Sequence, residues 1–128
     1  MANDVRKRIL LVDDEAGIRL TLPRILGKHD FEVTSVANVK DALAEIKTEK
    51  FDALLSDLNL PLPNEGFAIV KAMRRHQPRC ANFILTGYPA DESAMQALDL
   101  QVAHYFTKPV DIEKLVSIIK AKLATNGR

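Results

Sequence analysis

Three carboxylates stand directly after two short apolar runs of this sequence. Asp13 and Asp14 follow residues 9–12, and Asp57 follows residues 51–56. Carboxylates that lie within a few ångströms of one another repel, so either some of them bind protons or a cation binds among them. Oxygen ligands suit Mg²⁺, which takes one or two carboxylates and keeps several waters. The pattern predicts a magnesium site, provided that the fold brings the two runs together.

A hydroxyl and an amine complete the set of reactive groups. Thr86 follows residues 82–85, and Lys108 follows residues 104–107. A carboxylate held beside Mg²⁺, with a lysine and a hydroxyl nearby, is equipped to accept a phosphoryl group as the nucleophile. The metal ion and the lysine would stabilise charge on the phosphoryl oxygens during transfer. Each residue alone has a simpler explanation, such as a helix cap or the start of a turn, but the whole set is hard to obtain by accident.

The apolar runs predict the strands that position these groups. The runs that end at Asp13, Asp57 and Thr86 are nearly continuous in Ile, Leu, Val and Phe, which is typical of strands buried on both faces. Parallel strands end along one edge of a sheet, and open α/β sheets bind their ligands there. We expect five strands, at about residues 8–12, 31–36, 51–56, 82–86 and 102–106, with the second at an edge of the sheet.

Helices alternate with the predicted strands, and the last one has the strongest apolar stripe, within residues 112–123. Asn38, Asp91 and Asp111 are predicted N-caps. The helix after Thr86 has a small apolar face, so we expect it to be loosely held. Strict alternation and right-handed crossovers favour an α/β three-layer sandwich. Its predicted core is a five-stranded parallel sheet of order 2-1-3-4-5 with five helices, which is flavodoxin-like.

Length and composition set further limits. We expect residues 1–128 to form a single domain. A net charge of +1 argues against a nucleic-acid surface, which normally carries a basic excess. No apolar run approaches the roughly 20 residues that span a bilayer, so we expect no membrane contact. A lone cysteine, Cys80, suits a reducing compartment, and a cytoplasmic location is the expectation.

Four motifs give the chain a resemblance to a known family. It resembles the receiver domain of two-component response regulators over essentially its whole length. The carrying motifs are Ile-Leu-Leu-Val-Asp-Asp-Glu at 9–15, Ser-Asp-Leu-Asn-Leu-Pro at 56–61, Ile-Leu-Thr-Gly at 84–87 and Tyr-Phe-Thr-Lys-Pro at 105–109. The resemblance implies phosphorelay signal transduction, in which a sensor histidine kinase or a phosphotransfer protein donates phosphate to this domain.

The resemblance also implies a role for each site residue. Asp57 would be the phosphoacceptor. Asp14 would bind Mg²⁺ directly, Asp13 would bind it largely through water, and the backbone carbonyl of Asn59 would complete the protein ligands. We expect the domain to catalyse only its own phosphorylation and dephosphorylation. We do not expect it to be an enzyme that acts on an external substrate.

A second group of residues would report the phosphorylated state. By the resemblance, Thr86 would hydrogen-bond a phosphoryl oxygen and Lys108 would pair with the phosphate. The bond between Lys108 and Pro109 is expected to be cis, an isomer that only X-Pro bonds adopt at low cost. Tyr105 matches the aromatic switch position and is expected to rotate inward from an exposed position. The face made by the fourth helix, fifth strand and fifth helix would then engage a downstream protein or effector domain, as a monomer or a phosphorylation-dependent dimer.

One departure from the family pattern keeps an alternative open. The family usually has a loop glycine eight residues after the phosphoacceptor, whereas Gly66 lies nine residues after Asp57. The alternative is a receiver-like module that binds proteins without phosphorylation. A phosphatase of external substrates is disfavoured because Asn59 stands where a general acid would be needed, and a dinucleotide-binding domain because no Gly-x-Gly-x-x-Gly follows the first strand.

Overall fold

The computed structural model describes residues 6–126, so residues 1–5, 127 and 128 of the predicted domain lie outside the described residues. The five strands form one parallel sheet of order β2-β1-β3-β4-β5, which confirms the predicted fold class. The strands are β1 (Lys7–Val12), β2 (Phe31–Val36), β3 (Ala53–Ser56), β4 (Ala81–Thr86) and β5 (His104–Thr107).

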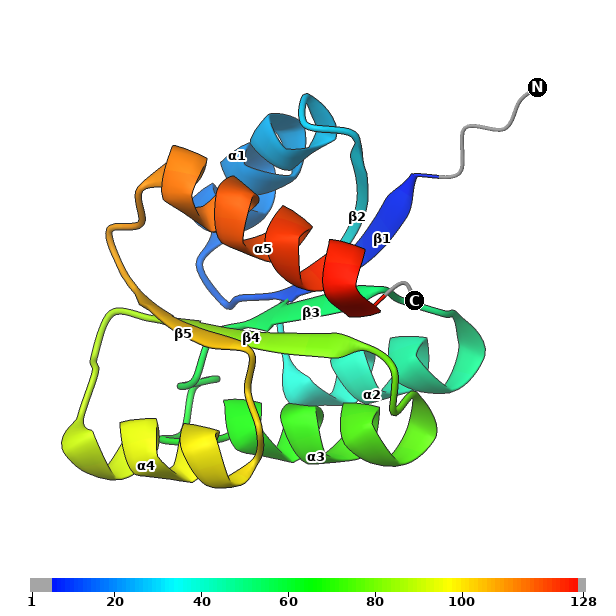
Figure 1. The fold of residues 1–128 in the computed structure, drawn as a ribbon. Helices are drawn as coiled ribbons and strands as arrows, with labels where there is room; N and C mark the ends of the chain where they lie inside the picture. The colour runs from blue at the N-terminus through cyan, green and yellow to red at the C-terminus, as the bar shows by residue number, and fades with distance from the viewer. Residues whose placement is uncertain (1–5, 127–128) are drawn as a thin grey trace.

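Five helices cover the sheet in two layers. Helices α1 and α5 lie on one face, and α2, α3 and α4 lie on the other (Figure 1). Right-handed crossovers between parallel strands produce this arrangement. The helices are α1 (Ala16–Gly27), α2 (Val39–Thr48), α3 (Gly66–His76), α4 (Asp91–Asp99) and α5 (Ile112–Asn126).

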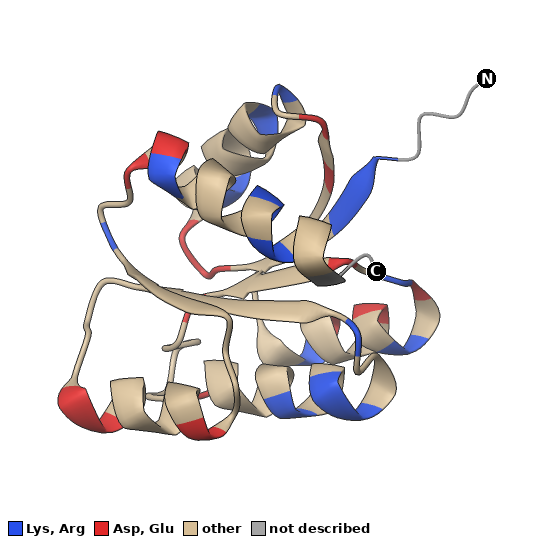
Figure 2. Cartoon of the chain, in the orientation of Figure 1, with Lys and Arg blue, Asp and Glu red and all other residues tan. Residues whose placement is uncertain are grey.

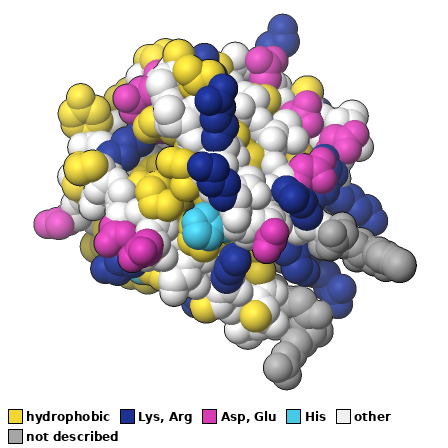
Figure 3. Space-filling model, turned by 90° about the horizontal axis from the view of Figure 1, so that it is seen from above, with side chains coloured by type: hydrophobic (Ala, Val, Ile, Leu, Met, Phe, Trp, Pro, Cys, Tyr) yellow, Lys and Arg dark blue, Asp and Glu magenta, His cyan; other side chains and the backbone are white. Residues whose placement is uncertain are grey.

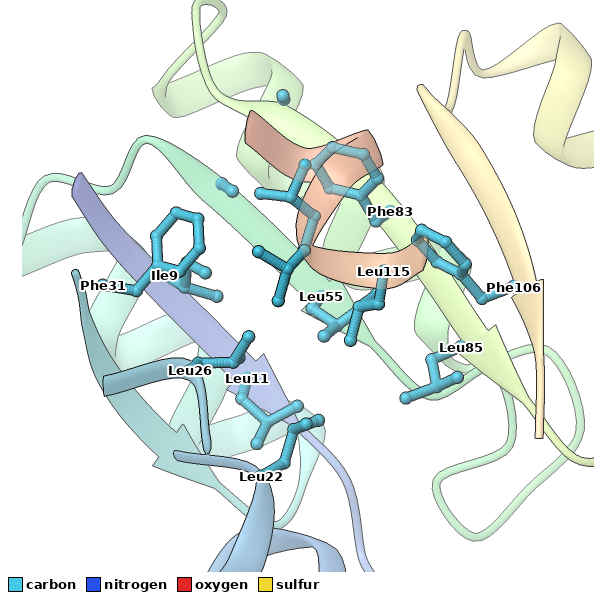
Figure 4. Close-up of a cluster of buried hydrophobic side chains, with 14 of the residues drawn as sticks. Ile9, Leu11, Leu22, Leu26, Phe31, Leu55, Phe83, Leu85, Phe106 and Leu115 are labelled. Carbon is cyan, nitrogen blue, oxygen red and sulfur yellow. The ribbon is translucent and has the colours of Figure 1, made fainter. Parts of the chain in front are cut away.

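The core consists of two apolar clusters, one on each face of the sheet. Alternate residues of the central strands point to opposite faces, so Leu11 and Leu55 join the cluster under α1 and α5, while Leu10 and Leu54 join the other. Figure 4 shows side chains from α1 and α5 meeting those of the strands in the first cluster. Burying a Leu, Ile or Phe side chain contributes roughly 1.5–3 kcal/mol, so these clusters fix the strand register and thereby the edge where the strands end.

The predicted helix starts were right at two positions and wrong at a third. The side chain of Asn38 accepts a hydrogen bond from the Asp41 amide at 2.8 Å, and Asp111 accepts one from the Lys114 amide at 3.2 Å. Asp91 is not a cap, because α4 already begins there and its N-cap is Ala90. An acidic side chain in the first turn still interacts favourably with the helix dipole, which explains the misleading signal.

Charged side chains are segregated over the surface. Figure 2 shows Lys and Arg at the start of β1 and in the C-terminal half of α3, and Asp and Glu at the starts of α4 and α5. Lys and Arg side chains also cross the face seen from above, beside hydrophobic ones (Figure 3). Within the described residues, no helix has the length and apolar character needed to cross a membrane.

Candidate functional site

The pairing of β1 with β3 brings the three predicted carboxylates to one place. Val12 is opposite Ser56 in the register, and the Asp57 amide donates to the Val12 carbonyl at 2.7 Å. Asp13, Asp14 and Asp57 each offer an oxygen, and these oxygens all lie within 4.8 Å of one another. Asp13 is fully buried and Asp57 is 7% exposed, whereas Asp14 is exposed to solvent.

Lys108 reaches the same site from the end of β5. Its amide donates to the Thr86 carbonyl at 2.8 Å, which holds the two strand ends together. Its Nζ lies 3.0 Å from Asp13 Oδ2 and 3.2 Å from Asp57 Oδ2. The third and shortest contact is to Glu15 Oε1. The peptide bond between Lys108 and Pro109 is cis, as the resemblance implied.

Asp13 and Lys108 shift each other's pKa. Burial raises the pKa of Asp13, although a hydrogen bond from the Glu15 amide at 2.9 Å and the nearby Lys108 partly offset this rise. For Lys108, burial favours a lower pKa, but contacts with the oxygens of Glu15 and Asp13 and the charge of Asp57 outweigh it, so its pKa is raised. The lysine therefore stays charged across the physiological range.

The donor set fits a hard divalent cation. All three groups that converge are carboxylates, which Mg²⁺ and Ca²⁺ prefer over softer ligands. Asp13 Oδ2 is buried and makes no hydrogen bond, although Lys108 lies close to it. Buried carboxylate oxygens normally accept hydrogen bonds, so this atom is suited to a metal-bound water or to the ion itself.

The enlarged loop after β3 keeps its glycine packed against the site. The Gly66 amide donates to the Leu58 carbonyl at 2.8 Å, and a Cβ at Gly66 would lie 2.3 Å from the Asp57 carbonyl oxygen. Further out in this loop, Asn64 adopts a positive φ of 65°. The side chain of Asn59 accepts a hydrogen bond from the Asn64 amide at 3.1 Å, so its orientation depends on this loop.

Thr86 and Tyr105 lie on the neighbouring strands β4 and β5. Thr86 is fully buried at the end of β4, and its Oγ1 accepts a hydrogen bond from the Tyr88 amide at 3.2 Å. Tyr105 is half-buried, and its hydroxyl lies 2.7 Å from Ser93 Oγ of α4. The prediction that Tyr105 rests in an exposed position was therefore wrong, because a hydrogen bond to α4 holds it.

Two residues of the site were missed from the sequence. Glu15 was quoted only as the end of a motif, yet it makes the shortest contact of Lys108. Ser93 was not singled out, although its Oγ donates to the Ala90 carbonyl at 2.9 Å and contacts Tyr105. A serine three residues after a helix N-cap is a signal for such local bonding, and it would have indicated the bonds between Ser93 and Ala90.

The comparison with protein families decides the identity of this fold and site. Residues 9–120 match the family model described as the response regulator receiver domain. The chain belongs to this family. The receiver domain is 33% identical over 118 residues to the response regulator protein PilR of Pseudomonas aeruginosa, covering 92% of this chain and 26% of PilR. It is 29% identical to sporulation initiation phosphotransferase F of Bacillus subtilis, covering 93% of this chain and 95% of that protein.

Solved structures show the same relationship. A CheY-like response regulator receiver domain protein from Methanospirillum hungatei superposes with a TM-score of 0.90 at 31% identity, covering 96% of this receiver domain and 98% of that chain. A Burkholderia pseudomallei response regulator, solved with a phosphorylated aspartic acid, a calcium ion and citrate, has a TM-score of 0.83 at 27% identity, covering 93% and 69%. The receiver domain thus spans about a quarter of PilR but nearly all of the phosphotransferase.

Proposed function

We propose that Asp57 is the phosphoacceptor of this receiver domain and takes its phosphoryl group from a histidine kinase or a phosphotransfer protein. A carboxylate oxygen of Asp57 would bond to phosphorus as the bond from phosphorus to the donor imidazole nitrogen breaks. The imidazole leaves, and the product is an acyl phosphate. The observation that carries this proposal is the convergence of three carboxylates and the Lys108 ammonium at one strand edge.

The metal ion of the proposal is Mg²⁺. Asp14 and Asp57 would hold it directly, Asp13 would hold it through water, and the Asn59 carbonyl would complete the protein ligands. When bound, the ion would neutralise charge on the phosphoryl oxygens. The Burkholderia protein was solved with both a phosphorylated aspartic acid and a calcium ion, which supports a divalent cation in such a site.

Lys108 and Thr86 would act on the phosphoryl group itself. Lys108 already lies 3.2 Å from Asp57 Oδ2, so its Nζ is placed to exchange a carboxylate partner for a phosphoryl oxygen. Thr86 would donate a hydrogen bond from its hydroxyl to a second oxygen, because the contact with the Tyr88 amide uses the hydroxyl only as an acceptor. The phosphoryl group would thereby pull on the end of β4.

The output surface of the proposal is the face of α4, β5 and α5. Movement at Thr86 would open space for Tyr105 and release its hydrogen bond to Ser93 of α4. The exposed Met95 and Leu98 of α4 would then be repositioned for a downstream partner, an effector domain or a second copy of the chain. We propose that residues 1–128 act as one such regulatory domain.

Phosphorylation can be tested with acetyl phosphate and Mg²⁺. Intact-mass spectrometry should show one labile phosphate adduct on the wild type, and none in Asp57→Asn or with EDTA. Asp99→Asn, which alters an exposed carboxylate of α4, is the matched control and should label normally. An unlabelled wild type, under conditions that label another receiver domain, would favour the phosphorylation-independent module.

A further inference from the structure

A basic pocket lies at the edge of the sheet opposite to Asp57. Its volume is about 500 Å³, which falls in the range of small-molecule sites. Arg74 of α3, Asn82 of β4, Leu98 of α4 and Lys122 of α5 contribute to its walls, and Arg79 comes from the loop before β4. Three consecutive elements and the more distant α5 thus build one concave site.

Three cations and no carboxylate line this pocket. Within residues 6–126, none of Arg74, Arg79 and Lys122 makes a salt bridge. Arg74 donates only to the neutral Gln101 side chain, at 3.3 Å. Burial raises the pKa of Cys80 in the pocket wall to about 12, so this thiol adds no opposing charge. Unpaired positive charge in a concave site attracts an anion.

The dipole of α3 explains only part of this charge. Arg74 lies in the last turn of α3, where a cation is favourable next to the helix carbonyls. Arg79 and Lys122 lie outside that helix, so the dipole of α3 does not account for their positions. Figure 2 shows Lys and Arg gathered at this end of α3. The cations of three segments therefore converge on the pocket.

Asn82 gives the pocket a specific polar group. It is only 5% exposed, and its Oδ1 is buried without a hydrogen-bond partner in the part of the chain that the structure describes. Buried amide oxygens nearly always accept a hydrogen bond, so an unpaired one costs free energy. Asn82 lies among the apolar Leu98, Val102 and Ala103 of the pocket wall. Asn82 is also part of the pocket lining, so its amide is the polar group that a ring on the apolar wall would meet.

We propose that this pocket binds a nucleoside phosphate. The phosphate would lie among Arg74, Arg79 and Lys122, and the base would pack on the apolar wall. The amide N–H groups of Asn82 can donate to the acceptor atoms along the edge of a nucleobase. The described lining contains no activated nucleophile or general base, so the site would hold its ligand without chemistry.

The test titrates ¹⁵N-labelled protein in EDTA with AMP, GMP or inorganic phosphate. At least one nucleotide should bind and shift the side-chain amide signals of Asn82 and Gln101. Inorganic phosphate should bind at least about tenfold more weakly, because it offers nothing to Asn82 or the apolar wall. Arg79→Gln and Lys122→Gln should each weaken nucleotide binding about tenfold, a loss of roughly 1.4 kcal/mol.

Arg75→Gln is the matched control, since Arg75 is exposed on α3 and does not line the pocket. This variant should bind the nucleotide like the wild type, and labelling of Asp57 by acetyl phosphate should be normal in all variants. If the Asn82 amide signals do not shift at about 10 mM nucleotide, any binding is too weak for a specific site, and the proposal is overturned. An equal loss in Arg75→Gln, or equal affinity for inorganic phosphate, would also overturn it.

Discussion

At the scale of single residues, Lys108 balances the charge of the acidic cluster. Its ammonium group contacts Asp13, Asp57 and Glu15, and its side chain is only 15% exposed. Asp13 is fully buried, and burial raises its pKa even with the lysine in place. Removing the lysine would leave a buried carboxylate beside a second one without compensation. Lys108 thus supports the fold as well as any chemistry at Asp57.

Lys108→Met is expected to destabilise the metal-free protein by about 3 kcal/mol at pH 7, the cost typical of losing one partner of a buried ion pair. The pKa of Asp13 is already raised, so acidification through that value neutralises its carboxyl and removes the unpaired charge. The Lys108 pKa is raised by its carboxylate partners, so the lysine is fully charged below the usual 10.5, but its stabilising contribution falls once acid protonates Asp13. Urea denaturation in EDTA should therefore show a smaller deficit at pH 4 than at pH 7.

Lys40→Met in α2 is the control for this change, because Lys40 is exposed and makes no salt bridge within residues 6–126. It should alter stability by no more than about 0.5 kcal/mol. If Lys108→Met loses the same free energy of unfolding at both pH values, the lysine contributes through packing and not through its charge.

Asp14→Asn tests the proposed metal ligand. Asp14 is the exposed member of the three carboxylates, so its replacement disturbs little packing and lowers the repulsion among them. We expect at least about tenfold weaker Mg²⁺ binding by calorimetry, since even the loss of a residue that only orients a metal ligand has an effect of that size. In EDTA the variant should melt at or above the wild-type temperature. Undiminished Mg²⁺ affinity would remove Asp14 from the ligands.

The residues that could be predicted from the sequence are those whose place depends on the backbone. Asp13 and Asp57 had to lie together once their two strands were neighbours. Glu15 could not be assigned, because its role depends on the rotamer that reaches Lys108. For Ser93, the local bonds to Ala90 could be predicted, but its contact with Tyr105 could not. The lack of a hydrogen-bond partner for Asn82 Oδ1 also depends on side-chain packing, and the alternation of residues along the strand does not predict it.

At the scale of elements, α4 is the helix held most lightly. Its buried residues are Ser93 and Ala97, both small, while Met95 and Leu98 are 67% and 75% exposed. By contrast, α3 buries Phe67, Ile69, Val70 and Met73 among others. Little apolar burial means a low free energy of local opening. This agrees with the loosely held helix that its small apolar face predicted.

Ser93→Ala should loosen α4 further. The change removes the contact of Ser93 Oγ with the Tyr105 hydroxyl and its bonds to Ala90, which together stabilise the start of the helix. We expect a loss of about 1 kcal/mol and faster amide hydrogen exchange across α4, with α3 unchanged. Ser117→Ala on the exposed face of α5 is the control and should leave exchange in α4 as it is. Unaltered α4 exchange in Ser93→Ala would mean that the helix is held by other contacts.

The loop between β3 and α3 is tied to the site through Gly66. A methyl group there would meet the Asp57 carbonyl oxygen at 2.3 Å and Leu58 Cα at 2.9 Å, and both are backbone atoms. Gly66→Ala should therefore cost about 3 kcal/mol through displaced backbone. Gly17→Ala in α1 has no atom within 4 Å of its Cβ and should instead stabilise the protein by about 0.5–1 kcal/mol. Thermal unfolding of the two variants measures both effects, and equal changes would refute the packing argument.

At the scale of the whole molecule, the strand order was the most predictable property. Continuous apolar strands separated by amphipathic helices leave few alternatives once crossovers are right-handed. The start of β5 was less certain, and the strand begins at His104 instead of residue 102. There the Gln101 backbone has a positive φ of 58°, which the residue type does not signal. The basic pocket was not predicted, because its walls come from four elements that only the assembled fold brings together.

The separation of charge over the surface has a consequence for the behaviour of concentrated solutions. The chain has a net charge of only +1, so overall repulsion between molecules is weak. The acidic edge at Asp13, Asp14 and Asp57 faces away from the basic edge around Arg74 and Arg79. One molecule can therefore attract the next head to tail, an association that does not close on itself. We expect light scattering to rise with protein concentration at low ionic strength and to fall on adding about 0.15 M salt, which screens charges beyond about 8 Å.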